Sequence, residues 1–501
     1  MVKGEKTILK ATRLTEESVK YSIDKKMIDN KRDNIVIGNE IIYYDGSELQ
    51  ILEKPQYNMF KEDEFINDLT NDNEINSIVS FYEKFEKENP VRIINKKQFN
   101  TPVNFKQAKL FPRHRWYTYK EGFSPQFVED FIKRYSKSAK DVIFDPFGGI
   151  GTTVLQSSFL NHTSFSNDIN PLSNFIAKVK TENYTKIDIK NLKKEFNSFM
   201  ESELIIKADP PINLTVNNYF TIDTLDSILK IQHWISQIKS EKIKNIFSVA
   251  LLTILETMST HRKDGNGVKK KKNIDQNFIV SEIKELIINQ LILFIYDIEN
   301  NILEIKPQIN HQSSFDKYRL DKKADIVITS PPYANCFDYS KVYLVELWFG
   351  GFFKNSGDQK SFRQSSITSH VHYKWEKRHG EFGHELINNQ IKSFLIKQNL
   401  WDKKIPNMLI GYFSDMGKVL YEMIPNLNKN SFIGIVVGNS VYGGLPIATD
   451  ILLSQIAIRL GYEFICIESY RTLTTSSQQL KIIREKDKIY LRESLIILRW
   501  N

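Results

Sequence analysis

The chain has almost no cysteine: Cys336 and Cys466 are the only two among 501 residues. Two thiols cannot build a disulfide framework or a cysteine-rich zinc site, so we expect a reducing, cytoplasmic environment and no metal centre. No apolar run reaches the roughly 18 residues of a membrane span. The first residues also lack the apolar core and cleavage site of a secretion signal. These absences argue against secreted disulfide-rich and membrane-spanning classes.

What the chain has in excess is positive charge, with a formal net charge of +9. A basic balance suggests a polyanionic partner such as nucleic acid, although many basic proteins bind none. Hydrophobic residues make up 41% of the chain, which at this length allows two or three domains with a sizeable core. Charge therefore gives a direction that needs support from chemistry.

Strands and helices alternate along much of the chain, which indicates an α/β sheet covered by helices. A helix should begin at Pro125 with Ser124 as its N-cap, and another should end at Gly461. Short apolar runs predict strands near 142–145, 165–168, 325–328 and 431–438, and the runs 463–471 and 493–500 predict a final hairpin pair.

The stretch DPFGGIGTT, residues 145–153, follows one predicted strand and opens a helix. Its glycines Gly148, Gly149 and Gly151 permit close backbone approach and positive φ. Asp168 ends the next predicted strand, where a carboxylate could bind ribose hydroxyls of a nucleoside cofactor at the mouth of a doubly wound sheet. The spacing is neither G-x-G-x-x-G nor a Walker loop. The alternative is a tight strand-to-helix turn without a ligand.

The stretch TSPPYANCFDYS, residues 329–340, stops the predicted strand 325–328 abruptly. Pro331 and Pro332 lack amide hydrogens and fix φ, so they cannot continue the strand. The turn should therefore be rigid and should present Ser330 and Tyr333. Such a turn can be an active site, or a structural turn with a packed tyrosine.

The two stretches together resemble amino-directed, site-specific DNA methyltransferases of bacterial restriction–modification systems. DPFGGIGTT looks like the family's S-adenosylmethionine motif, and SPPY looks like its catalytic motif. HRWYTYKEGFSPQFV, SPPYANCFDYSKVYLVELWFGGF, YFSDMGKVL, VVGNSVYGGLPIATD and RESLIIL extend the match to one bacterial branch. The resemblance covers about residues 111–500, apart from stretches of two polar or helical segments, and implies a Rossmann-like methyltransferase fold.

The resemblance implies roles for particular residues. Ser330 and the carbonyl of Pro331 would accept hydrogen bonds from the target amine, Pro332 would hold the turn, and Tyr333 would stack on a base flipped out of the duplex. The implied cofactor is S-adenosylmethionine, and its expected contacts are Asp145, Pro146, Phe147, Gly148, Gly149, Gly151, Thr152, Thr153 and Asp168, with Phe123 and Ser124 in a segment that closes over it together with Glu121.

Two features depart from a simple match. Where the family often has an acidic residue near the adenine, this chain has Ser313 and Ser314, with Asp316 nearby. Cys336 invites comparison with ring-carbon methyltransferases, whose nucleophile follows a proline directly. Here Ala334 and Asn335 separate Cys336 from the prolines, so we interpret Cys336 as a packing residue.

Contacts with DNA phosphates need exposed cations. The glycine-punctuated stretch HRKDGNGVKKKKN supplies Arg262, Lys263, Lys269 and Lys270, although a solvated charge run is an alternative. Arg363 has a side chain suited to bases. The histidines nearby could suggest a metal, but we favour a polar loop that faces DNA; they are His370, His372, His379 and His384.

The expected partner is double-stranded DNA, with a cognate restriction endonuclease acting separately and no membrane. Ser330 favours cytosine-N4 over adenine-N6 as the target. An RNA methyltransferase and a DNA-binding module with a relic pocket are the rivals. The expected segments are an accessory region (1–105), the cofactor half of the core (106–180), a helical insertion (181–310), the catalytic motif (311–353), a polar segment (354–405) and the C-terminal half of the core (406–501). The helical insertion, the polar segment or both are expected to read the DNA sequence.

Overall fold

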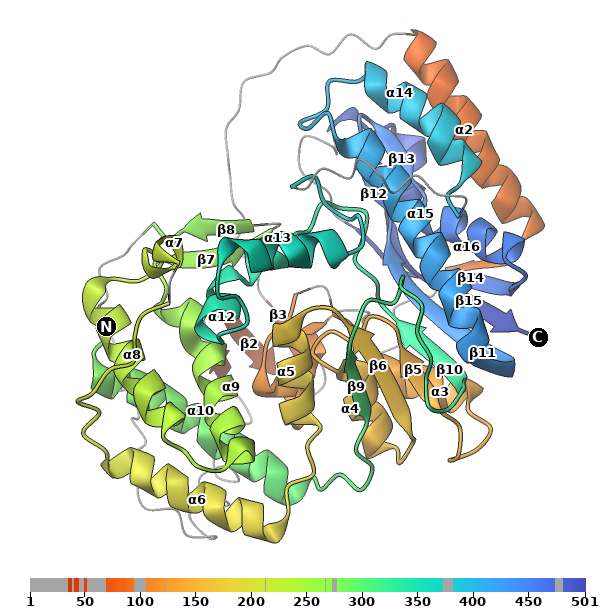
Figure 1. Ribbon diagram of the computed structural model, residues 1–501. Coiled ribbons are helices and arrows are strands. Elements are labelled where there is room, and N and C mark those ends of the chain that lie inside the picture. The colour runs from red at the N-terminus through yellow and green to blue at the C-terminus, as the bar shows by residue number, and fades with distance from the viewer. Residues whose placement is uncertain are drawn as a thin grey trace.

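The computed structural model describes residues 35–37, 40–44, 49–51, 69–93, 105–120, 122–211, 213–265, 267–272, 277–372, 382–473 and 481–501. Its centre is an eight-stranded sheet in the order β4-β14-β15-β11-β10-β5-β6-β9 (Figure 1). These strands are β4 (Val91–Ile93), β5 (Ile143–Asp145), β6 (Ser164–Asp168), β9 (Gln308–His311), β10 (Ala324–Thr329), β11 (Leu427–Gly438), β14 (Glu463–Thr472) and β15 (Arg492–Trp500).

The run β11-β10-β5-β6-β9 is parallel throughout, and β15 lies antiparallel between β11 and β14. The expected hairpin pair of the last two strands is confirmed. The expected α/β class is confirmed as well, because the protein has helices and a large, mainly parallel sheet. Because parallel strands end at one edge, the segments that follow β5, β6 and β10 come together there.

Both faces of the sheet are buried, because successive side chains along a strand point in opposite directions. On one face Ile143, Ile326 and Ile328 pack in a cluster with α3 (Pro125–Tyr135). On the other face Phe144 and Val327 join a larger cluster formed with α15 (Ile405–Met423), α16 (Thr449–Arg459) and α2 (Leu69–Glu88). The helix α3 begins as expected, since the Ser124 hydroxyl accepts a hydrogen bond from the Phe127 amide at 3.1 Å.

A second body of helices lies beside the sheet, at the lower left of Figure 1. Its apolar side chains form one buried cluster. The helices are α5 (Pro171–Lys180), α6 (Lys186–Glu201), α7 (Leu214–Asn217), α8 (Ile222–Ser236), α9 (Glu241–Met258), α10 (Val280–Asn300) and α12 (Leu344–Phe349), and between α9 and α10 runs the hairpin β7 (His261–Asp264) and β8 (Gly267–Lys270).

A buried carboxylate, Asp297 of α10, fastens the segment that precedes the glycine-rich turn. It accepts hydrogen bonds from the Arg113 amide at 2.8 Å, from Arg115 and from the Trp116 indole at 2.9 Å. The Trp116 ring also stacks on Phe294, with 4.5 Å between centroids. The basic residues of this segment therefore hold it against the helices.

The remaining elements are short. They are the antiparallel sheet β1 (Ile35–Ile37), β2 (Glu40–Tyr44) and β3 (Leu49–Ile51), the ribbon β12 (Ser440–Tyr442) and β13 (Leu445–Ile447), and the helices α4 (Thr152–Phe159), α11 (Tyr339–Val342), α13 (Ser356–Ser365) and α14 (Lys392–Lys397). The expected segment boundaries stay a prediction. Among the described residues no helix combines the length and the apolar character that a membrane span requires.

Candidate active site

A pocket of about 950 Å³, open solvent at its mouth included, lies where β5, β6 and β10 end. Residues of both stretches line it, which brings together positions almost 190 residues apart in the chain. Of the expected cofactor and catalytic residues, those that line it are Phe123, Asp145, Pro146, Phe147, Gly148, Gly149, Thr152, Asp168, Ser330 and Pro332.

Asp145 joins the two stretches through hydrogen bonds. Its carboxylate accepts from the hydroxyls of Thr153 at 2.6 Å and Thr329 at 2.7 Å, and from the Phe147 amide at 3.0 Å. Only 2% of Asp145 is exposed, and burial raises its pKa to about 6. One side chain thus sets the glycine-rich turn and the end of β10 relative to each other.

The turn needs its glycines for three different reasons. Gly149 and Gly151 have φ of 49° and 81°, where side chains are strained. A Cβ atom on Gly151 would lie 2.8 Å from the Cβ of Ala177, so helix α5 could not pack as closely. A Cβ on Gly148 would lie 2.6 Å from the Cβ of Ser166.

Asp168 lies at the end of β6, as the sequence predicts, and is partly exposed to the pocket. It accepts hydrogen bonds from the amides of Gly149 at 2.8 Å and Asn170 at 2.7 Å. Burial raises the pKa of Asp168 despite these bonds. Each carboxylate oxygen keeps a further acceptor site, so Asp168 can still bind a hydroxyl group.

Ser313 and Ser314, the two serines at the position expected for an acidic residue, have different surroundings. Ser314 is buried and donates to the Pro146 carbonyl at 2.6 Å, so it braces the start of the turn. Ser313 lines the pocket beside Gln312. Gln312 and Ser313 therefore offer neutral polar groups to the pocket.

Ser330 lines the pocket, whereas the Tyr333 side chain packs behind it. The Tyr333 hydroxyl lies 3.4 Å from the Ser330 hydroxyl and donates to the buried Glu493 carboxylate at 2.9 Å. Only 9% of Tyr333 is exposed, and its ring fills the space that a side chain on Gly438 would need. Glu493 also accepts from Arg471 at 2.5 Å.

Cys336 does not line the pocket, and 3% of it is exposed. Burial raises the pKa of its thiol to about 11, so the thiol is protonated at neutral pH. Its sulfur lies 3.5 Å from the Tyr442 hydroxyl. These contacts support the interpretation of Cys336 as a packing residue.

The segment before the turn reaches the pocket through Tyr119, Gly122 and Phe123. The Tyr119 ring stacks on Tyr343 with 4.9 Å between centroids. Ser124 is fully buried as the cap of α3, and Glu121 lies outside the described residues.

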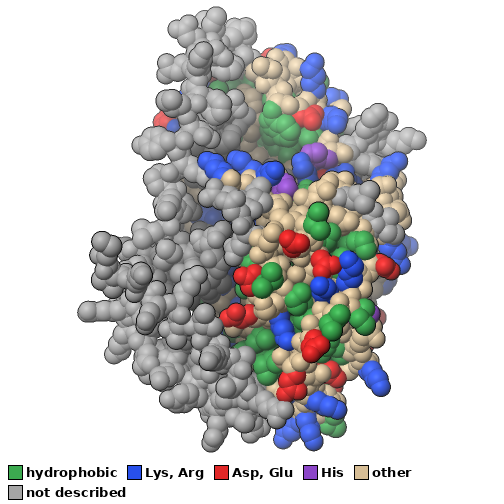
Figure 2. Space-filling model, turned by 90° about the vertical axis from the view of Figure 1, so that its left-hand side faces the viewer, with side chains coloured by type: hydrophobic (Ala, Val, Ile, Leu, Met, Phe, Trp, Pro, Cys, Tyr) green, Lys and Arg blue, Asp and Glu red, His purple; other side chains and the backbone are tan. Residues whose placement is uncertain are grey.

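The basic residues of the hairpin β7–β8 are of two kinds, exposed and largely buried. Arg262, Lys269 and Lys270 are exposed. Lys263 is 11% exposed, pairs with the buried Glu346 and lies over the Tyr343 ring at 4.6 Å. On the face drawn in Figure 2, Lys and Arg side chains gather in a band across the middle, with His side chains beside it.

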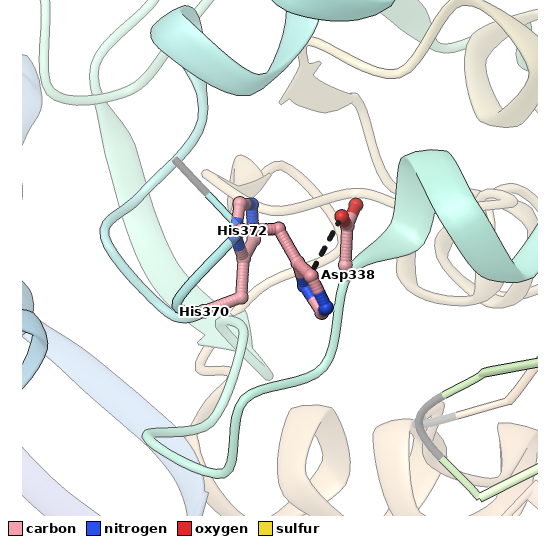
Figure 3. A group of neighbouring side chains, drawn as sticks. All are labelled: Asp338, His370 and His372. Carbon is pink, nitrogen blue, oxygen red and sulfur yellow. Dashed lines mark ion pairs between the residues drawn. The ribbon is translucent and has the colours of Figure 1, made fainter. Parts of the chain in front are cut away.

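Three basic side chains of the polar segment, Arg363, His370 and His372, lie near Asp338. Figure 3 draws the two histidines with Asp338. Arg363 binds its carboxylate at 2.8 Å and 3.0 Å, and His372 lies 3.5 Å from it. Burial alone would raise the pKa of Asp338, but His370, Ser340 and Arg363 lower it below the ordinary value. Burial lowers the pKa of His370 to about 4.

Two of the four histidines in the expected polar, DNA-facing loop are buried in the structure. His370 and His384 are 3% and 8% exposed, and His384 bonds Gln455 at 2.6 Å. The sequence predicts an exposed loop for His370 and His384, because polar composition does not distinguish an exposed loop from a buried, hydrogen-bonded one. His379 lies outside the described residues.

Sequence reasoning did not place residues from the polar segment in the pocket. The structure adds Phe362, Ser365, Ser366, Ile367, Ser369 and His370 to its lining. Phe337, Asp338 and Tyr339, from the loop after Pro332, line it as well. Asp338 in FDYS was a signal of this arrangement. A buried carboxylate beside a rigid turn needs a partner, and here the partners come from the polar segment.

Three proteins are similar to this chain over most of its length. The type II methyltransferase M.BsoBI of Geobacillus stearothermophilus is 27% identical over 79% of this chain and 87% of its own. M.AvaI of a Nostoc species is 26% identical over 82% and 92%, and M.MvaI of Kocuria varians is 23% identical over 68% and 80%. Both are also named type II methyltransferases. No protein-family model matches the chain.

Proposed function

We propose that the chain is a site-specific DNA methyltransferase of a restriction–modification system, with a Rossmann-like core, that methylates the exocyclic amine of a base in duplex DNA. One observation carries the proposal: the glycine-rich turn and the Ser-Pro-Pro-Tyr turn line a single pocket and share the Asp145 carboxylate. The similarity to type II methyltransferases over about four fifths of the chain supports the same reaction. A separate endonuclease would complete such a system.

The residues that line the pocket suit S-adenosylmethionine in their chemistry. Asp168 offers acceptors for ribose hydroxyls, the glycines let a ligand approach the backbone, and Phe147 adds an apolar surface. Gln312 and Ser313 also line the pocket, and we propose that they bind the polar edge of the adenine ring in place of an acidic residue.

When bound, S-adenosylmethionine supplies an electrophilic methyl group on a positively charged sulfur. An exocyclic amine is a poor nucleophile, because its lone pair is delocalised into the ring. The Ser330 hydroxyl and the Pro331 carbonyl accept hydrogen bonds from the two N–H groups and favour a nitrogen with a localised lone pair. The two prolines fix the turn, so these acceptors need little reorganisation.

The favoured target is cytosine-N4, because a serine occupies the first position of the tetrapeptide; adenine-N6 is the alternative. Tyr333 is proposed to present its ring to the extruded base. In the structure its hydroxyl bonds Glu493, which fixes the direction of the ring. Such contact requires the ring to be uncovered as the base enters, since 9% of the residue is exposed.

Expression in a host whose DNA lacks methylated bases tests the proposal. Sequencing that detects modified bases should reveal N4-methylcytosine at one short recurring sequence, and an isogenic strain with Ser330→Ala should not. N6-methyladenine at such a sequence would keep the enzyme class and correct the base. Methylation confined to RNA, or none at all with a folded wild-type protein, would reject the proposal.

A further inference from the structure

The pocket is larger than the part that the glycine-rich turn and Ser330 account for. Beyond them, its lining comes from the loop 337–339 and from the end of α13 with the loop that follows it. The polar side chains of this wall are Ser365, Ser366, Ser369 and His370. The segment expected to read DNA from outside is thus partly inside the pocket.

One end of the wall is tied to the catalytic loop by Asp338, of which 1% is exposed. One carboxylate oxygen accepts from the amide and hydroxyl of Ser340 at 3.0 Å and 2.6 Å. The other accepts from two nitrogens of Arg363, while the Arg363 Nε also contacts the Ser340 hydroxyl at 2.9 Å. Both oxygens are therefore engaged, and so is one edge of the guanidinium group.

The middle of the wall is tied to helix α15. Thr368 donates to the Asp415 carboxylate through its amide at 2.9 Å and its hydroxyl at 2.7 Å. Gly411 allows the contact, because a Cβ atom there would lie 2.6 Å from the Thr368 side chain. The loop 366–370 is consequently held by Arg363 just before it and by Thr368 within it, which suits a surface that must fit a ligand.

We propose that Asp338 and Arg363 are positioning residues that hold residues 365–370 as the part of the pocket that receives the extruded base. This inference rests on the proposed function. The wall offers hydroxyl groups and the His370 imidazole, which can donate and accept hydrogen bonds along the polar edge of a base. Arg363 acts from behind this surface, through Asp338, and not as a contact to bases in a groove.

A divalent metal is the rival occupant of the same cluster, because ligand atoms of Asp338, His370 and His372 lie within 4.8 Å of one another (Figure 3). The hydrogen bonds disfavour it. A cation at this point would compete with the positive charge of Arg363 for the same carboxylate oxygen. Calorimetry with zinc distinguishes metal binding at this cluster from the positioning role.

The chain contains a matched control for the pair. Arg134 binds the buried Glu468 at 2.8 Å and 2.9 Å, and the exposed fractions of the two side chains, 28% and 3%, resemble the 22% and 1% of Arg363 and Asp338. Neither Arg134 nor Glu468 lines the pocket. Arg134→Met should therefore reproduce the loss of a buried pair without an effect on the pocket.

The experiment uses a duplex with the recognition sequence found by sequencing and with 2-aminopurine at the target position. Arg363→Met and Asp338→Asn should each reduce the fluorescence gained on binding, and the methyl-transfer rate on normal duplex should fall about 10- to 100-fold. The dissociation constant of S-adenosylmethionine, measured by calorimetry, should change less than about twofold. The double variant should be no worse than the single ones, because the two residues act as a unit.

Equal losses in Arg363→Met and Arg134→Met would overturn the inference, as would a parallel loss of cofactor affinity. Calorimetry of the wild-type protein with zinc alone provides the other arm: tight binding abolished by His372→Ala would assign the cluster to a metal. If wild-type protein methylates no DNA, the proposed function itself fails. A wild-type enzyme with unaffected Arg363 and Asp338 variants would reject only the positioning role.

Discussion

Asp145→Asn replaces the carboxylate that joins the two turns with a neutral group of the same shape. Burial raises the pKa of Asp145 from 3.8 to about 6, although the Thr153 and Thr329 hydroxyls lower it. Each pKa unit is worth about 1.4 kcal/mol, so the folded state disfavours the ionised carboxylate by about 3 kcal/mol. Asparagine cannot ionise and does not carry this cost.

The sign of the pH effect follows from proton binding. Between about pH 4 and about pH 6 the folded chain holds a proton on Asp145 that the unfolded chain has released. The contribution of Asp145 to stability is therefore complete below about pH 4 and is lost as the pH rises through about 6. The free energy of unfolding of the asparagine variant should gain about 3 kcal/mol relative to wild type over this interval.

Denaturant unfolding followed by tryptophan fluorescence at a series of pH values measures this difference. Repetition at high salt is the control, because a buried group is screened little and the difference should persist. A difference that does not change between about pH 4 and pH 7 would refute the reasoning, since the carboxylate would then not be desolvated.

Four other predictions concern the pocket and its surroundings. Ser330→Ala should lower the methyl-transfer rate about 100-fold and leave calorimetric cofactor affinity unchanged, because it removes one amine acceptor. Replacement of the exposed Lys269 and Lys270 by alanine should reduce the salt dependence of DNA binding, measured by fluorescence anisotropy, by about 1 to 2 in log–log slope. Lys263→Met should leave that slope unchanged but reduce the free energy of unfolding by about 3–5 kcal/mol, as a buried carboxylate loses its partner. The Cys336 thiol, with a pKa of about 11, should not react with an aromatic disulfide reagent in the native protein at neutral pH.

Three of these four predictions have the following opposing outcomes. Weakened cofactor binding in Ser330→Ala would indicate a structural serine. A changed salt slope in Lys263→Met, with stability retained, would place that lysine on the phosphates after all. Rapid labelling of Cys336 before unfolding would show that its surroundings open in solution.

Local patterns were enough to predict the elements that carry the site. The start of the helix at Pro125 is predicted by its N-cap and first turn alone, and the turn after residue 145 is predicted by its glycines alone. Both turns meet because parallel strands end at one edge of the sheet, so the order of motifs indicated a common pocket. These are effects of neighbouring residues and of sheet geometry.

Partners distant in the chain were not predictable in the same way. The sequence predicts Lys263 as a contact to DNA phosphates and Arg363 as a contact to bases, yet buried carboxylates 83 and 25 residues away bind them. Glu493, 160 residues after Tyr333, sets the direction of the tyrosine hydroxyl. Such pairs depend on which loops the fold brings together, and no local periodicity encodes that.

The pocket is proposed to methylate an exocyclic amine of a base in duplex DNA. This activity is measured most directly by incubating purified protein with labelled S-adenosylmethionine and mixed-sequence duplex DNA and then separating the nucleosides. Label should appear in N4-methylcytosine, with none in the Ser330→Ala reaction above about 1% of wild type. Wild-type protein that binds S-adenosylmethionine yet leaves every DNA nucleoside unlabelled would contradict the proposal.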